Sequence, residues 1–141
     1  MDSTEIEKSV DKALADDGIE YSVVRQGKDR VGEQSHWLVT LTKGTESEAF
    51  EFHMGDGHRV YLNADKTRSK VPPPTAASVL HCLVLDAQFG EQTFSDFCAE
   101  FGSNGDSIKD RRTYFACQET VTKLRNVGLS VAKYSELLRD Y

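Results

Sequence analysis

The spacing of apolar residues changes twice along this chain, and this change constrains the fold more than any other feature. In residues 3–17 apolar side chains recur at helical spacing, as in Ile6, Val10 and Leu14. In residues 19–54 they alternate with polar ones, and from residue 75 the helical spacing returns. The chain therefore predicts an α+β fold with an N-terminal helix, a three-stranded antiparallel sheet, and then three or four helices.

Three segments have the alternating pattern of strands, at residues 19–23, 35–43 and 50–54. Trp37, Val39 and Leu41 share one face of the second segment, and Phe50 and Phe52 share one face of the third. Short polar links between the segments favour an antiparallel meander with one buried face. Residues 59–62 are a candidate for a further edge strand.

A chain of 141 residues is long enough for one domain with its own core. Consecutive prolines, Pro72 to Pro74, exclude a helix until they end. We therefore expect a single domain, residues 1–141, in which a link at 63–74 joins a helix-plus-sheet half (1–62) to a helical half (75–141).

Capping residues divide the helical half. Thr75 and Thr93 are good N-caps, and Gly90 predicts a turn at residues 88–92 between their helices. Gly102 predicts the end of the second helix, and Asp106 is the expected cap of a long third one. The third helix has a predicted inner face formed by Ile108, Tyr114, Cys117, Val121 and Leu124. A final helix is predicted at residues 130–141, with an inner face formed by Val131, Tyr134, Leu137 and Leu138.

The order of one helix, three strands and a helix resembles the double-stranded-RNA-binding domain. That family contacts RNA with a Lys-rich helix start after the sheet. Here the corresponding helix begins with residues Thr75 to Ser78, which include no base. The resemblance therefore supports the topology but not an RNA-binding function.

Two segments are candidate metal sites. His53, Asp56 and His58 supply possible zinc ligands, but glycines between them suit a hairpin turn, and no further ligand follows at zinc spacing. Residues 101–110 are rich in oxygen donors, but they lack the alternating acids and distant Glu of a calcium loop. We expect no metal and no cofactor.

The three cysteines, Cys82, Cys98 and Cys117, are odd in number and widely spaced, so we expect reduced thiols. Cys98 and Cys117 lie on apolar helix faces and should be buried. Cys82 follows His81, but neighbours on a helix point in different directions. We therefore expect no catalytic residues and no enzyme; a small cysteine enzyme using Cys82 remains the alternative.

The net charge is −6, and the acidic residues are concentrated in two regions. Residues 1–20 carry −5 and residues 81–100 carry −4. Such a chain is a poor candidate for binding nucleic acid directly, but carboxylates on a helix can mimic phosphates before a basic protein surface. The predicted partner-binding residues are Asp2, Glu5, Asp16, Glu91, Asp96 and Glu100. A phage regulatory protein acting on nucleic acid through Arg111 and Arg112 is a further alternative.

A longer pattern covers residues 50–126 and resembles a recurrent family of small acidic proteins from phages and prophages. It includes MGDGH at 54–58, PPPT at 72–75, TFSDFCAEFG at 93–102, DSIK at 106–109 and TYFACQET at 113–120. One departure is Ser103, where an aromatic residue is common in such proteins.

This resemblance implies a non-enzymatic protein that binds and inhibits a host defence complex. By analogy with anti-CRISPR proteins, the expected partner is a CRISPR effector with a basic nucleic-acid-binding surface. The acidic start of the chain is unlike a signal peptide, and no apolar run is long enough for a bilayer. We therefore expect a protein of the bacterial host's cytoplasm.

Overall fold

The computed structural model describes residues 2–26, 35–54, 73–102 and 107–141. The elements follow in the predicted order, so the α+β fold is confirmed. They are α1 (Ser3–Asp16), β1 (Glu20–Gln26), β2 (Ser35–Lys43), β3 (Glu46–Met54), α2 (Ala76–Gly90), α3 (Phe94–Phe101), α4 (Ile108–Asn126) and α5 (Val131–Leu137). The candidate edge at 59–62 and most of the link at 63–74 lie outside the described residues.

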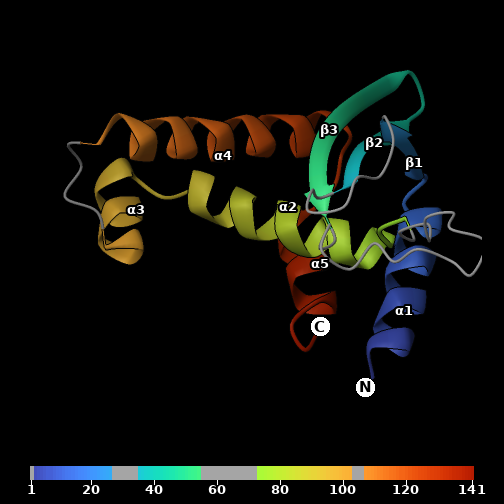
Figure 1. The fold of residues 1–141 in the computed structure, drawn as a ribbon. Coiled ribbons are helices and arrows are strands. Elements are labelled where there is room, and N and C mark those ends of the chain that lie inside the picture. The colour runs from blue at the N-terminus through green and yellow to red at the C-terminus, as the bar shows by residue number, and fades with distance from the viewer. Residues whose placement is uncertain (1, 27–34, 55–72, 103–106) are drawn as a thin grey trace, which may run out of the picture.

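The molecule consists of a body and a projecting arm (Figure 1). The body contains the sheet, α1, α5 and the first half of α2. From it α2 and α4 run side by side, with α3 at their far end. We call α3, the second half of α2 and the first half of α4 the arm.

The three strands form an antiparallel meander in the order β1-β2-β3. In the central strand, Val39 is paired with Val23 on one side and Phe50 on the other. Val39, Leu41 and Phe50 are all buried. The predicted alternation is therefore confirmed, and it places one face of the sheet against the helices of the body.

α1 begins at Ser3, as the sequence range 3–17 predicts. Its N-cap is Asp2, whose carboxylate accepts a hydrogen bond from the backbone N–H of Glu5 at 2.9 Å. An ionised cap also interacts favourably with the positive end of the helix dipole, which a hydroxyl does not. The predicted apolar stripe of Ile6, Val10 and Leu14 is buried.

Contacts between α1 and the C-terminal region close the body. Asp17, at the end of α1, accepts hydrogen bonds from Lys133 Nζ at 2.8 Å and from the hydroxyl of Tyr134 at 2.8 Å. These two hydrogen bonds lower the pKa of Asp17. The Tyr134 side chain is fully buried, so its hydroxyl needs this partner.

The turn between α2 and α3 is present but shorter than predicted, because residues 88–90 still belong to α2, which ends at Gly90, and the turn occupies residues 91 and 92. Gly90 is buried where α2 crosses α4. A Cβ atom there would lie 2.5 Å from the carbonyl carbon of Cys117 and closer still to its oxygen. The glycine, which is the last residue of α2, is needed for the close approach of the two helices.

The arm has a small apolar cluster of its own, separate from the main core. Phe97, Cys98 and Tyr114 are buried in it, with Phe89 and Phe94 packed against them. The Tyr114 hydroxyl donates a hydrogen bond to the backbone carbonyl of Gln92 at 2.6 Å and so ties α4 to the α2–α3 connection.

Two expectations for α4 are wrong. Ile108, predicted to face inward, is 69% exposed, because it lies on the side of α4 opposite the buried Cys117. The N-cap is Ser107 in place of Asp106, and its hydroxyl accepts from the backbone N–H of Asp110 at 3.3 Å. Gly102, with φ of 71°, ends α3 as predicted.

Candidate functional site

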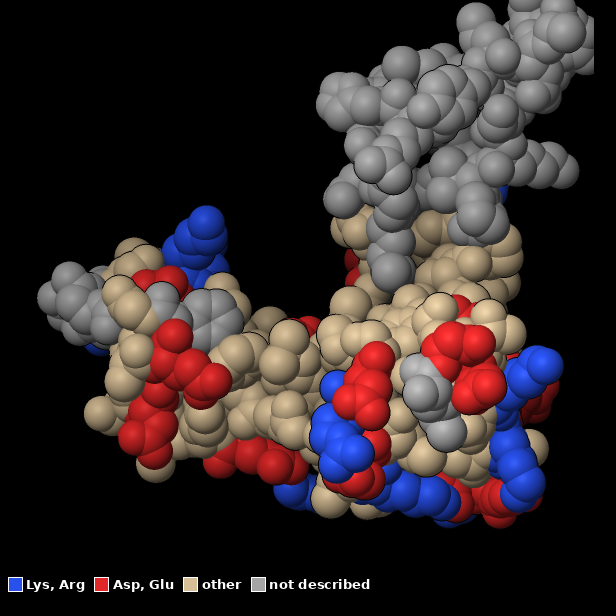
Figure 2. Space-filling model, turned by 90° about the horizontal axis from the view of Figure 1, so that it is seen from below, with Lys and Arg blue, Asp and Glu red and all other residues tan. Residues whose placement is uncertain are grey.

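The acidic residues of α3 lie at the end of the arm. Thr93 caps this helix by accepting from the backbone N–H of Asp96, and Phe97 and Cys98 point into the arm cluster. Asp96 and Glu100 therefore occupy the opposite, exposed side, one helical turn apart. Figure 2 shows acidic side chains gathered there. Gln92 donates to Glu100 Oε2 at 2.6 Å, which restrains this carboxylate.

Glu91 lies apart from this pair. It lines a shallow pocket of about 250 Å³ together with Val121 and Arg125 of α4 and Leu129 and Val131 beyond it. Glu91 thus shares the wall of this pocket with Arg125 of the same chain. Glu91 is a weaker candidate for a partner's cation than Asp96 or Glu100.

The acidic residues of α1 are partly used within the helix. Asp2 and Glu5 lie together at its start, where Asp2 is the cap. Asp16 lies at the other end and forms an exposed ion pair with Lys12 at 2.6 Å. The hydrogen bond and charge of Asp16 in turn raise the pKa of Lys12. The negative charge predicted for this face is therefore offset at its C-terminal end.

The six predicted binding residues do not form one surface. α1 belongs to the body, and α3 lies at the opposite end of the molecule (Figure 1). Of these residues, the structure brings together Asp2 with Glu5, and Asp96 with Glu100.

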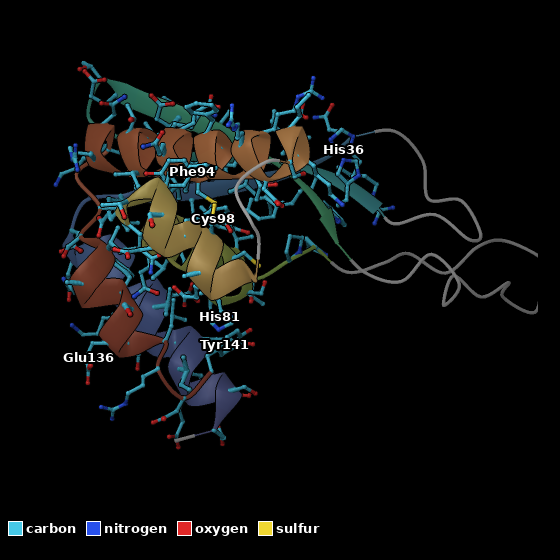
Figure 3. The ribbon with its side chains drawn as sticks, turned by 90° about the vertical axis from the view of Figure 1, so that its left-hand side faces the viewer. His36, His81, Phe94, Cys98, Glu136 and Tyr141 are labelled. Atoms are coloured by element: carbon cyan, nitrogen blue, oxygen red, sulfur yellow. The ribbon has the colours of Figure 1, made fainter. Side chains whose placement is uncertain are left out.

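A groove that sequence reasoning missed lies on the other side of the arm. It has a volume of about 390 Å³ and is lined by Phe94 of α3 and by Arg111, Tyr114, Phe115 and Gln118 of α4. Phe94 sits where α3 meets α4 (Figure 3). Phe115 is 64% exposed. The sequence could have indicated this exposure, because Phe115 does not lie on the same side of the helix as the apolar stripe of α4.

Arg111 and Arg112, the alternative nucleic-acid site, are both exposed on α4. Arg111 lines the aromatic groove beside Phe94 and Phe115. The two arginines are on the same end of the molecule as Asp96 and Glu100, so the end of the arm carries charges of both signs. A strand of phosphates would meet repulsion from the carboxylates as well as attraction.

The cysteines are free thiols with different exposure. Cys98 and Cys117 are buried, as predicted, and Cys82 is half-buried. Burial, with a smaller contribution from the charge of Asp86, raises the pKa of Cys82, which lowers its reactive thiolate fraction at neutral pH. His81 makes an edge contact with Tyr141 at 5.8 Å between ring centroids (Figure 3).

The candidate zinc ligand His53 stacks on His36 of the neighbouring strand, with 4.4 Å between ring centroids. Asp56 and His58 lie outside the described residues, as does the middle of the candidate calcium loop, residues 103–106. Among the residues that can be assessed, no three ligand-bearing side chains gather in a metal-binding arrangement.

Within the described ranges, no helix combines the length and apolar character needed to cross a membrane. Comparison of the chain with protein-family models, with curated proteins and with solved structures finds no match.

Proposed function

We propose that this protein is a non-enzymatic phage or prophage protein that inhibits a host defence complex, such as a CRISPR effector, by stoichiometric binding. The end of the arm, with Asp96 and Glu100, enters a basic surface that otherwise holds nucleic acid. The observation that supports this most is the placement of two exposed, adjacent carboxylates at the tip of a projecting helical unit.

The geometry suits this role for two reasons. Phe97 and Cys98 fix α3 against the arm cluster, so its carboxylates are held on a rigid support and lose little freedom on binding. Adjacent carboxylates on one helix face can each accept charge-assisted hydrogen bonds from Arg side chains, as phosphates do. α1 is the weaker candidate, since Asp16 is already paired with Lys12.

The test is a phage challenge of bacterial strains that each carry one active CRISPR system. Expression of the wild-type chain should restore plaque formation in a susceptible strain, and the purified chain should bind that strain's effector. The double variant Asp96→Lys with Glu100→Lys should bind at least about tenfold more weakly, because each charge-assisted hydrogen bond contributes about 1.5–3 kcal/mol. Wild-type binding should weaken as salt rises.

The matched control is Glu136→Lys with Asp140→Lys, which reverses two exposed acids of the same spacing in and just after α5. This control should inhibit as well as the wild type. Equal inhibition by the arm variant and the wild type would exclude the acidic tip as the contact. A wild-type chain that protects phage in no strain would exclude CRISPR inhibition.

A further inference from the structure

The outer side of α4 carries apolar side chains that the fold leaves exposed. Ile108 is 69% and Phe115 is 64% exposed, one on each side of Arg111. Phe115 also forms a wall of the groove of about 390 Å³ described above. We call Ile108, Arg111, Phe115, Gln118 and Glu119, together with Phe94 of α3, the α4 face. An aromatic residue exposed beside an apolar groove is typical of an interaction surface.

The α4 face is built on a fixed support. Phe94 and Tyr114, which line the groove, have ring centroids 5.3 Å apart, and Phe97 lies beneath them with its centroid 5.2 Å from that of Tyr114. Gln118 donates to the Tyr114 hydroxyl at 3.2 Å. A groove with walls held in this way loses little conformational entropy when it is filled.

Charge is arranged symmetrically about Phe115. Arg111 lies one turn before it and Glu119 one turn after it. If a second α4 lies antiparallel on the first, with a twofold axis through Phe115, each Arg111 faces Glu119 of the other copy. The same operation places Arg112 opposite Gln118 and brings the two Phe115 rings to the grooves at the centre.

Arg111 and Glu119 are both exposed. Glu119 is 69% exposed, and its interaction with Lys123 is at 3.9 Å on the surface, which contributes little. The sheet meets α4 at Lys123 and Asn126, through hydrogen bonds to Ala49 and Glu48. Lys123 lies about 12 Å along the helix from Phe115, so the centre of the α4 face is clear of these contacts.

We propose that the α4 face binds a second copy of this chain, as a twofold antiparallel pair of α4 helices centred on Phe115. The self-complementary order of Arg111, Phe115 and Glu119 favours a second copy over an unrelated partner, because one surface supplies both halves of each ion pair. This pairing leaves Asp96 and Glu100 free on the opposite side of α3, and it does not depend on the proposed inhibition.

Sedimentation equilibrium of the whole chain, from about 1 µM to about 500 µM, tests the proposal. The wild type should show a monomer–dimer equilibrium. Phe115→Ser and Arg111→Glu should each raise the dimer dissociation constant at least about tenfold. The charge-swapped double variant Arg111→Glu with Glu119→Arg should recover most of the wild-type dimer, because the ion pair is restored with its signs exchanged.

The control is Glu136→Lys on α5, which should leave the dimer dissociation constant unchanged. Circular dichroism should show the same helical content for every variant, since the changed side chains are exposed. A wild-type chain that is monomeric at all concentrations overturns the proposal. So does a dimer that Arg111→Glu leaves intact, or one that the charge swap fails to restore.

Discussion

Substitution of Gly90 by Ala should separate the two helices of the arm. The added Cβ would lie 2.5 Å from the carbonyl carbon of Cys117 and 2.8 Å from the backbone nitrogen of Gln118. Ordinary van der Waals contact begins at 3.4 Å. Because both partners are backbone atoms of α4, no side chain can rotate away, and the helices must move apart by about 1 Å.

The expected cost combines two opposing effects. Overpacking of a close contact costs up to about 3 kcal/mol. Ala is favoured over Gly in a helix by about 1 kcal/mol, and this offsets part of the cost. The free energy of unfolding should therefore fall by about 2 kcal/mol. For a chain of this size the melting temperature should fall by about 8 °C.

Urea unfolding followed by circular dichroism measures this change, and the near-ultraviolet signal of the arm aromatics should weaken in the folded variant. Gly102→Ala is the control, since its Cβ would meet nothing within 4 Å and its φ of 71° alone should cost about 1–2 kcal/mol. If Gly90→Ala is as stable as the wild type, or more stable, the close approach of α2 and α4 is not what requires the glycine.

Three further measurements test the body and the thiols. The Tyr21 hydroxyl donates a hydrogen bond to the backbone carbonyl of Pro74 at 2.9 Å. Tyr21→Phe removes this hydrogen bond and should lower the free energy of unfolding by about 1 kcal/mol. Burial raises the pKa of Tyr21 to about 12. The free energy of unfolding of the wild type, measured by urea titration, should therefore fall as the pH rises from about 10 to 12. In Tyr21→Phe this fall should be less steep. Asp17→Asn should lower the melting temperature at pH 7. The pKa of Asp17 is lowered in the folded state, so the stability that its carboxylate contributes is lost on protonation. The difference in melting temperature between the variant and the wild type should therefore shrink below about pH 4. In a thiol titration at pH 8, Cys82 should react before Cys117, whose pKa burial raises to about 11; equally fast reaction of both would contradict the burial described here.

Sequence reasoning succeeded where the signal lies within one element. The hydroxyl of Thr93 accepts a hydrogen bond from the backbone N–H of Asp96 as a cap should, and Gly102 adopts a positive φ at the end of α3. It placed the turn after α2 about three residues too early, because a glycine read alone indicates a break, and Gly90, the last residue of α2, is required for another reason. The actual cause is a contact with Cys117, which belongs to a different helix and is set by the tertiary structure.

The outward position of Ile108 was within reach of the sequence. At about 100° per residue, Ile108 lies on the side of α4 opposite the buried Cys117. For the candidate site, the exposure of Asp96 and Glu100 followed from the apolar positions of α3. The separation of those residues from Asp2 and Glu5 did not, because it depends on the direction in which the arm leaves the body.

The two apolar clusters also differ in how much chain must be made before each can form. The arm cluster joins residues no more than about 25 positions apart, such as Phe94 and Tyr114. The body closes only when Lys133 reaches Asp17, 116 positions earlier, and Tyr141 reaches Glu7, 134 positions earlier. Local contacts form fast and distant ones slowly. On the ribosome we therefore expect the arm to assemble first, while the first helix and the sheet, although synthesised earlier, wait for α5 before their packing is complete.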